Sequence, residues 1–223
     1  SVARQWQDMQ VGVKGQYRVV SNGIDTEHYA AAETLELPGE PRLVVVASMT
    51  PEKGLDVLIR AMSFIVAEFP CVCLYVVGDG PLRKPLEALA CELGLEQRIR
   101  FVGIQPDVRP YLSSCDLALL PSLSEGMGLA AVEAMAVGRA VVGSHTGGIP
   151  EVVVEGETGL LFPPGDVQGM ASAMAVLLRN PTRRLAMGRA GQARAHEQFS
   201  LQRALAQLQA LYVELLRAKG IEL

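Results

Sequence analysis

Short apolar runs rich in β-branched residues alternate with longer stretches of helical periodicity along most of the chain. The apolar runs have the length and composition of strands that are buried on both faces. They span residues 42–47, 71–78, 98–103, 116–121 and 139–144. The helical stretches between them span residues 55–69, 81–94, 107–115 and 128–138. Strand and helix in turn is the pattern of a parallel sheet, because neighbouring parallel strands are joined by a crossover of about a dozen residues or more.

This alternation predicts an α/β fold with a Rossmann-like, doubly wound parallel sheet, which we place at residues 18–196. From residue 166 onward the periodicity is helical throughout. Residues 197–223 are expected to form a C-terminal helix with Ser200 as its N-cap. The broad apolar face of this helix fits either the core of this domain or the surface of another domain. Residues 1–17 are expected to be the end of a preceding domain or a linker helix.

Composition and charge exclude several classes of protein. With 223 residues, of which 49% are hydrophobic, the chain can bury a substantial core. A net charge of −4 gives no overall positive field, so no nucleic-acid partner is expected. No apolar run reaches the roughly 18 residues of a membrane span, and the first residues lack the apolar core of a signal peptide. We therefore expect a cytoplasmic protein.

Cysteine and histidine residues give no sign of a metal site. The cysteines lie among apolar neighbours without the spacing of zinc ligands, so they are expected to be reduced residues of the core. These are Cys71, Cys73, Cys91 and Cys115. The three histidines are scattered, and no pair has the spacing of metal ligands on a helix. No bound metal is therefore expected.

Loops rich in glycine and small polar residues follow four of the predicted strands. These loops are residues 48–54, 78–81, 122–128 and 144–148. In open parallel sheets, ligands bind outside the carboxyl ends of the strands, where such loops meet. A single loop of this kind is ordinarily just a tight turn. Four of them at one edge predict a ligand-binding crevice.

Individual loop residues have both a structural and a functional interpretation. Lys53 precedes a helix, beside free N–H groups and the positive end of the helix dipole, which is favourable for phosphate. A solvated lysine after a turn is nevertheless the commoner arrangement. Asp79 is expected to cap the helix that follows it rather than to bind a ligand. Gly147 and Gly148 either bring backbone amides close to a ligand or only permit the bend.

Two carboxylates stand out in the apolar segment 124–138. Glu125 lies before a helix, where free N–H groups stabilise negative charge, so its simplest role is a cap. Glu133 has only apolar neighbours in its helix, and burying an unpaired carboxylate is costly. Eight helical residues span about 12 Å, so the two carboxylates can contact separate parts of one elongated ligand. Hydroxyl groups of a ribose and a hexose would satisfy both charges.

Six segments, taken in order, resemble one family. They are VVSNGIDTEHY at 19–29, TPEKGLDVLIRA at 50–61, VVGDGPLR at 76–83, RIRFVG at 98–103, LLPSLSEGMGLAAVEAMAVGRAVVGSHTGGIPEVV at 119–153 and ETGLLFPPGD at 157–166. Together they resemble the retaining GT-B glycosyltransferases of glycosyltransferase family 4, also described as glycosyl transferases group 1. The single fragments are unspecific, whereas the ordered set covers nearly the whole chain and is highly specific.

This resemblance implies a role for each candidate residue. Glu125, the catalytic candidate, would bind the transferred sugar near the reacting carbon. Glu133 would bind the ribose hydroxyls, Lys53 would bind the diphosphate, and Ile104 or its neighbours would lie near the base. The backbone would approach the sugar and the phosphates at Gly126, Met127, Gly128 and Leu129. The implied donor is a nucleotide diphosphate sugar, and neither a metal nor another cofactor is implied.

The chain departs from the family pattern in two ways. Where the family has Gly-Arg before the Pro-Glu-Lys-Gly turn, this chain has Ala47 and Ser48. With Ser48 at that position of the donor site, a charge-assisted contact to the diphosphate of about 1.5–3 kcal/mol is lost. The family also has two Rossmann-like domains, of which the first holds the acceptor, and this chain resembles only the second. By itself it is expected to bind a donor without turning it over.

The leading hypothesis is therefore the donor-binding half of a retaining glycosyltransferase. It would transfer a hexose to an acceptor held by an N-terminal domain outside this chain, and the last helix would dock on that domain. The alternatives are a non-catalytic nucleotide-sugar or partner-binding module and a GT-B nucleotide-sugar epimerase. The full-length enzyme is expected in the cytoplasm, with peripheral association at the inner face of the cytoplasmic membrane left open.

Overall fold

A six-stranded parallel sheet organises residues 17–220, the part of the chain that the computed structural model describes. The strands lie in the order β3-β2-β1-β4-β5-β6. Their bounds are β1 Arg42–Val46, β2 Cys73–Val77, β3 Ile99–Gly103, β4 Leu117–Leu120, β5 Val141–Ser144 and β6 Gly159–Phe162. The predicted doubly wound, Rossmann-like sheet is thus confirmed. The expected domain end or linker helix at residues 1–17 lies outside the described residues except for Tyr17.

The last strand is the one that the pattern of the sequence does not predict. β6 has four residues, Gly-Leu-Leu-Phe, and pairs with β5 from Val141↔Gly159 to Ser144↔Phe162. This run begins with a residue of low strand propensity, and its three apolar residues lie in a segment rich in glycine and proline, which is typical of a loop. The five predicted strands, by contrast, all appear in the sheet.

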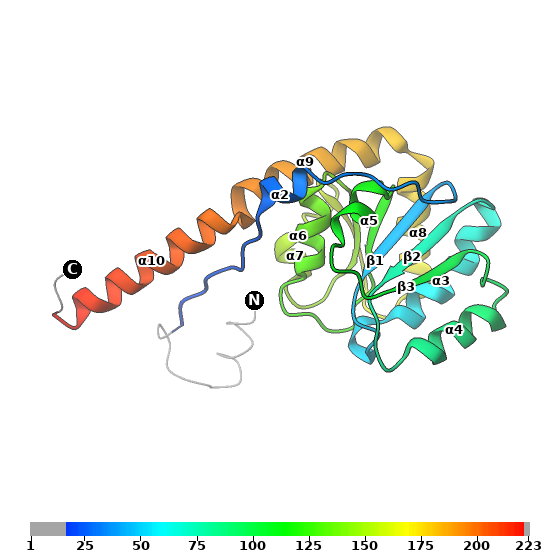
Figure 1. Cartoon of the computed structure of the whole chain (residues 1–223), viewed down its shortest axis with the longest axis horizontal. Coiled ribbons are helices and arrows are strands. Elements are labelled where there is room, and N and C mark those ends of the chain that lie inside the picture. Colours follow the sequence, from blue (N-terminus) through cyan, green and yellow to red (C-terminus); the bar gives the residue numbers. More distant parts are fainter. Residues whose placement is uncertain (1–16, 221–223) are drawn as a thin grey trace.

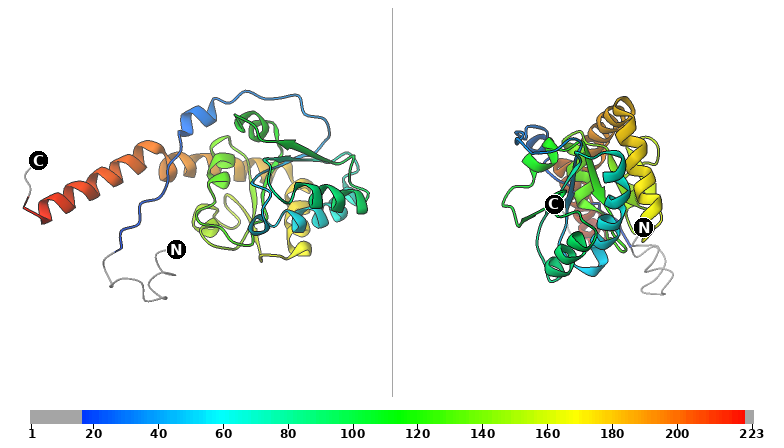
Figure 2. Two further views of the ribbon diagram at one scale, coloured as in Figure 1. Left: turned by 60° about the horizontal axis from the view of Figure 1, so that its bottom comes forward. Right: turned by 90° about the vertical axis from the view of Figure 1, so that its right-hand side faces the viewer.

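Helices cover both faces of the sheet (Figures 1 and 2). One face is covered by α3 (Leu55–Glu68), α4 (Arg83–Glu92) and α8 (Val167–Arg179). The other face is covered by α5 (Arg109–Ser114), α6 (Leu129–Ala136), α7 (Ile149–Val152) and α9 (Pro181–Phe199). The short helix α2 (Thr26–Ala30) lies outside α6, and the 3-10 helix η1 (Pro51–Lys53) follows β1.

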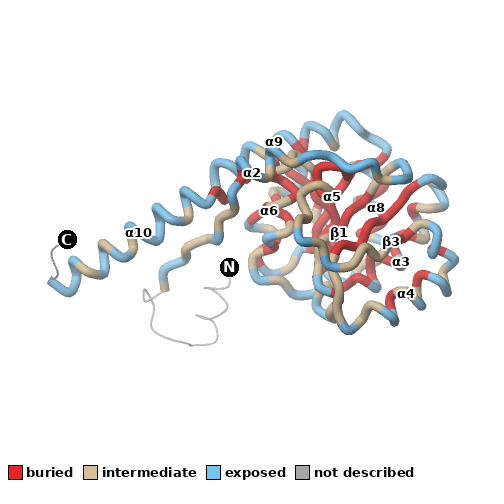
Figure 3. The backbone as a smooth tube through the Cα atoms, viewed as in Figure 1, coloured by how far each residue is buried: buried red, intermediate tan, exposed pale blue. Residues whose placement is uncertain are grey.

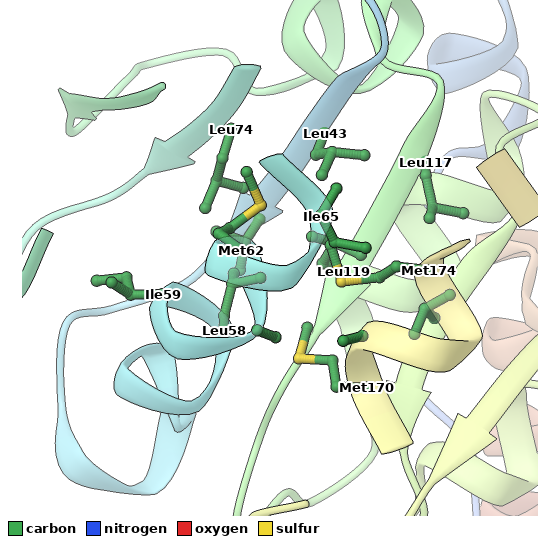
Figure 4. Packing of buried hydrophobic residues seen from close by; sticks show 14 of the residues in the cluster. Leu43, Leu58, Ile59, Met62, Ile65, Leu74, Leu117, Leu119, Met170 and Met174 are labelled. Atoms are coloured by element: carbon green, nitrogen blue, oxygen red, sulfur yellow. The ribbon is translucent and has the colours of Figure 1, made fainter. Parts of the chain in front are cut away.

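The apolar strands supply two hydrophobic cores, because successive strand residues point to opposite faces. Leu43 and Val45 of β1 belong to one buried cluster, and Val44 belongs to the other. On the first face, α3 and α8 close over the strands with large buried side chains (Figure 4). These side chains are Leu58, Met62, Ile65, Met170 and Met174. Burying each such side chain contributes about 1.5–3 kcal/mol, so this face anchors the sheet.

The C-terminal region differs from the rest of the molecule. The last helix of the chain, α10 (Leu201–Ala218), begins after Ser200. The boundary between α9 and α10 therefore lies at Ser200 rather than between residues 196 and 197. Ser200 is the predicted N-cap residue, although its side chain makes no capping hydrogen bond. α10 has no buried residue and projects from the body (Figures 1 and 3). Of the two roles left open for this helix, closing the core of this domain is therefore excluded.

The apolar face of α10 is solvent-exposed in the described part of the chain. Its exposed large apolar side chains are Leu201, Leu205, Leu208, Tyr212 and Leu215. The segment before α2 contacts this helix at two places. Ile24 forms an isolated β-bridge with Ser200, and an Arg18 guanidinium nitrogen lies 3.3 Å from Glu214 Oε1.

Two of the four cysteines do not lie in the core. Cys73 and Cys115 are buried as predicted, but Cys71 and Cys91 are exposed. Cys71 precedes β2, and Cys91 lies on the outward side of α4, so apolar neighbours in the sequence did not imply burial. In the described part of the chain, no helix has the length and apolar character needed to cross a membrane.

Candidate functional site

A cavity of about 300 Å³ opens at the carboxyl ends of β1 and β4, where the strand order reverses. Open parallel sheets bind their ligands at such a reversal. The walls come from the loops after both strands, from the first turn of α6 and from the segment before α2. Five of the predicted site residues line it, namely Lys53, Glu125, Met127, Gly128 and Leu129. The predicted crevice is therefore present, but only two of the four predicted loops, residues 48–54 and 122–128, line it.

Lys53 and Glu125 are paired in the wall of this cavity. The Lys53 Nζ atom lies 2.8 Å from Glu125 Oε2. The two side chains are 23% and 17% exposed, so water only partly screens their attraction. They are also the only charged residues among those that line the cavity. Sequence reasoning predicted a separate ligand contact for each residue, but not that the two would touch.

The loop that carries Lys53 is held against the loop after β4. Gly54 has φ +59°, and a Cβ atom there would lie 2.3 Å from the carbonyl oxygen of Pro121. Only glycine permits both this conformation and this approach. The backbone N–H of Leu123 donates to the carbonyl oxygen of Glu52 at 2.7 Å. These contacts fix Lys53 above the cavity.

Glu125 accepts hydrogen bonds from two further groups. The Ser122 hydroxyl lies 3.1 Å from Oε2, and the Gly126 N–H lies 3.2 Å from Oε1. The expected capping role is wrong, because the N-cap of α6 is Gly128, which has φ +82°. The free N–H groups of the first turn of α6 therefore remain available at the cavity, where Leu129 lies.

The loop after β5 supports Glu125 from behind. Gly147 has φ +53°, and a Cβ atom there would lie 1.7 Å from the carbonyl oxygen of Glu125. At Gly148 a Cβ atom would lie 2.3 Å from the carbonyl oxygen of Gly126. Because Gly147 and Gly148 have no side chain, the backbone of residues 125 and 126 can pack directly against them. This role differs from the two that the sequence suggested, which were ligand contact and a simple bend.

Glu133, on α6, is held differently from Glu125. It does not line the cavity, and the Tyr29 side chain of α2 lies near enough for its hydroxyl to favour the charged form of the carboxyl. Burial raises the pKa of the Glu133 carboxyl, and the Tyr29 hydrogen bond partly opposes that rise. Burial, followed by the charge of Glu133, also raises the pKa of the Tyr29 hydroxyl. Tyr29 is therefore the polar neighbour of this partly buried carboxylate.

A profile of the family described as glycosyl transferases group 1 matches residues 40–180. This match covers more than half of the chain. The chain belongs to this family. The resemblance of the six sequence segments is thereby confirmed.

The curated relatives of this chain are longer than the chain itself. The N-acetyl-alpha-D-glucosaminyl L-malate synthase of Bacillus anthracis is 32% identical over 207 residues, which cover 90% of this chain and 54% of the relative. The lipopolysaccharide core biosynthesis glycosyltransferase LpsE of Rhizobium meliloti is 34% identical over 193 residues, which cover 85% and 56%. The chain thus spans about half the length of these relatives.

Solved structures of glycosyltransferases share the fold. Anabaena Alr3699/HepE in complex with UDP matches with a TM-score of 0.86 and 26% identity, over 96% of this chain and 62% of that one. A sucrose-phosphate synthase from Thermosynechococcus elongatus matches with a TM-score of 0.85 and 29% identity, over 97% and 57%. The GT-B assignment of this group 1 chain is therefore supported at the level of architecture.

Three further positions that the group 1 resemblance singled out, Gly126, Ile104 and Ser48, do not line the cavity. Ile104 is 78% exposed after β3, and Ser48 is exposed with its hydroxyl 3.2 Å from that of Thr50. Neither is among the residues that line the cavity. Asp79 does not cap α4, whose N-cap is Leu82, but accepts the Gly80 N–H. Asp79 also pairs with Arg83, the first residue of α4.

Sequence reasoning missed two polar residues of this group 1 site, Asn22 and Ser122, which both line the cavity. Ser122 directly follows Pro121 at the end of β4, and a polar residue at the carboxyl end of a strand is a signal that was available. Asn22 comes from a segment far from the strands in sequence, so only the fold brings it there. Within residues 17–220 no three histidine, cysteine or acidic residues gather as metal ligands would.

Proposed function

We propose that this chain is the donor-binding half of a retaining glycosyltransferase that transfers a hexose from a nucleotide diphosphate sugar. The acceptor would be held by an N-terminal domain outside this chain, so the chain alone would not turn over its donor. The observation that carries the proposal is the paired Lys53 and Glu125 in a cavity at the reversal of strand order. The complexes of Alr3699/HepE with UDP and with UDP-glucose give the chemical class of ligand to test.

Different residues of the cavity would contact different parts of the donor. Lys53 and the N–H groups at the start of α6 would bind the diphosphate and stabilise its negative charge as it leaves, without a metal. Glu125 would accept hydroxyl groups of the sugar near the reacting carbon. Backbone groups from Gly126 to Leu129 would line the path between sugar and phosphates. No side chain of the described residues replaces the family's arginine at the cavity wall.

Glu133 has a more specific part in the proposal. A ribose bound beside α6 would donate hydroxyl groups to this carboxylate, which is buried and has the Tyr29 hydroxyl as its partner. Hydroxyl donors stabilise the charged form, so ribose binding would lower the raised pKa of Glu133. The base would lie outside the cavity, toward Ile104 after β3.

The exposed face of α10 suits docking on that N-terminal domain. Its apolar side chains lie on a helix with no buried residue. The segment before α2 lies beside this helix through the contacts of Ile24 and Arg18. Action in the cytoplasm, with an acceptor at the inner face of the cytoplasmic membrane, completes the proposal.

The deciding experiment is calorimetric titration of this chain with UDP, GDP and ADP. One nucleotide should bind, Lys53→Met should weaken its binding about tenfold or more, and Glu133→Ala should also weaken it. Lys84→Met, on the exposed side of α4, is the matched control and should leave the affinity unchanged. Absence of binding by the unsubstituted chain to all three nucleotides would contradict the proposal for this chain.

A second candidate function is a non-catalytic nucleotide-sugar or partner-binding module. The observation that favours it is Ser48, exposed and outside the cavity where the family pattern has an arginine. Turnover of a nucleotide sugar by the full-length protein would exclude this candidate. Donor binding without turnover by the full-length protein would favour it.

A further inference from the structure

Ser122 occupies a buried position behind the carboxylate of Glu125. Its residue is only 3% exposed, and its hydroxyl lies 3.1 Å from Glu125 Oε2. The same oxygen lies 2.8 Å from Lys53 Nζ. One carboxylate oxygen therefore has two donors, one of which is neutral and fixed while the other is a cation on a long, flexible side chain.

The sheet itself holds Ser122 in place. Ser144, fully buried at the end of β5, donates its hydroxyl to the carbonyl oxygen of Ser122 at 2.5 Å. Pro121, the preceding residue, contacts the loop of Lys53 through Gly54. The backbone of Ser122 is thus held between β5 and the loop of Lys53, in the position from which its hydroxyl bonds Glu125.

Donor binding would remove one of the two donors from Glu125. A diphosphate carries more negative charge than a carboxylate, so it would draw Lys53 toward itself. Glu125 would then keep the Ser122 hydroxyl and the Gly126 N–H among the groups that bond it here. The Gly126 contact reaches only the other oxygen, Oε1.

We propose that Ser122 is a positioning residue for Glu125. Its hydroxyl keeps the carboxylate at the cavity wall when the diphosphate takes Lys53, so that the carboxylate faces the hydroxyl groups of the sugar. This inference rests on the proposed donor site. It assigns Ser122 an effect on the sugar moiety of the donor and none on the nucleoside diphosphate.

Calorimetry with matched ligands tests the assignment. The probes are UDP with UDP-glucose and GDP with GDP-mannose, titrated into the unsubstituted chain and into Ser122→Ala and Ser122→Cys. The cysteine variant fills the same space with a weak donor, which guards against collapse of the cavity. Both variants should lose about fivefold to tenfold in affinity for the sugar nucleotide, with the affinity for the free diphosphate within about twofold.

Two further variants complete the test. Ser122→Thr keeps the hydroxyl and should restore most of the affinity for the sugar nucleotide. Ser114→Ala removes a buried hydroxyl at the opposite edge of the sheet and should leave both affinities unchanged.

The outcomes separate this inference from the proposed function. The inference is wrong if Ser122→Ala and Ser122→Cys weaken the binding of the sugar nucleotide and of the nucleoside diphosphate equally. The hydroxyl would then contact the phosphates or have only a structural role. The inference is equally wrong if neither ligand is affected, although the donor site stands in both cases. If the unsubstituted chain binds none of the four probes and no ADP either, the proposed function fails, and the assignment of Ser122 fails with it. A chain that binds only ADP is tested in the same way with ADP and ADP-glucose.

Discussion

The two edges of the sheet each carry a charged cluster, and the clusters are built differently. At the amino-terminal edge, Asp116 accepts the backbone N–H of Arg42 at 2.8 Å and pairs with the guanidinium groups of Arg42 and Arg184. Arg184 also donates to the carbonyl oxygen of Leu177. At the carboxyl edge, the ammonium of Lys53 bonds only Glu125 among the groups of the described residues.

The two charged clusters differ in whether an ion pair can be exchanged for a contact to a ligand. At the amino-terminal edge, Asp116 and Arg184 bond backbone groups as well as each other, so the cluster joins β1, the start of β4 and α9. At the carboxyl edge the cation has one carboxylate partner beside a cavity, so a stronger anion can replace that partner without breaking the fold. Ion pairs of similar chemistry are therefore structural at one edge and exchangeable at the other.

The largest effect should come from Gly147→Ala. A Cβ atom at φ +53° would meet the carbonyl oxygen of Glu125 at 1.7 Å, so the loop must shift or strain. We expect the free energy of unfolding in urea to fall by about 3 kcal/mol or more, with loss of nucleotide binding. Gly156→Ala is the control, because its φ is +78° but nothing lies within 4 Å. The control should lose roughly 1 kcal/mol of the free energy of unfolding. If Gly147→Ala loses no more than that, the close packing of Gly147 against Glu125 does not restrict this position.

A pair of substitutions should separate the two edges. Asp116→Ala leaves two guanidinium groups without their carboxylate and should lower the free energy of unfolding by about 2 kcal/mol, with unchanged nucleotide affinity. Lys53→Met should do the reverse, changing stability by less than about 1 kcal/mol while weakening nucleotide binding about tenfold. Urea unfolding and calorimetry of both variants measure this. Equal loss of affinity in both variants would show that the edges are not independent.

The subtlest effect concerns the pH dependence of stability and involves Glu133. Because burial raises its pKa above the ordinary 4.5, the folded chain keeps this proton to higher pH than the unfolded chain. Its contribution to the free energy of unfolding is fully present below pH 4.5 and is lost as the pH rises through the folded pKa. Measured by urea unfolding from about pH 4 to about pH 8, Glu133→Gln should lack this dependence. The exposed Glu92→Gln should keep it, and identical pH profiles for all three chains would contradict the raised pKa.

Most of the fold follows from local pattern. The five predicted strands are recognisable as continuous apolar runs, the helices between them show helical periodicity, and the alternation of the two implies a parallel sheet. The position of the crevice follows from that topology. β6 was not predicted because the apolar residues of Gly159–Phe162 lie in a segment rich in glycine and proline, which is typical of a loop.

The contacts inside the site depend on distances that sequence does not carry. Lys53 and Glu125 are both recognisable beside helix starts, yet their pairing requires Gly54 and Gly147 to admit neighbouring backbone. Glu133 is recognisable as a misfit on an apolar helix, but its partner Tyr29 lies on a helix about a hundred residues earlier. Asp79 was expected to cap α4, but the turn before that helix leaves it beside Arg83 instead.

The exposure of helix α10 also affects how fast its amide hydrogens exchange with solvent. An 18-residue helix without a buried side chain lacks the tertiary packing that supplies most of the stability of helices in proteins. Its amide hydrogens should exchange with deuterium through local opening, whereas those of β1 should exchange only when the whole sheet unfolds. Slow exchange in α10 would then report the moment at which another domain covers its apolar face.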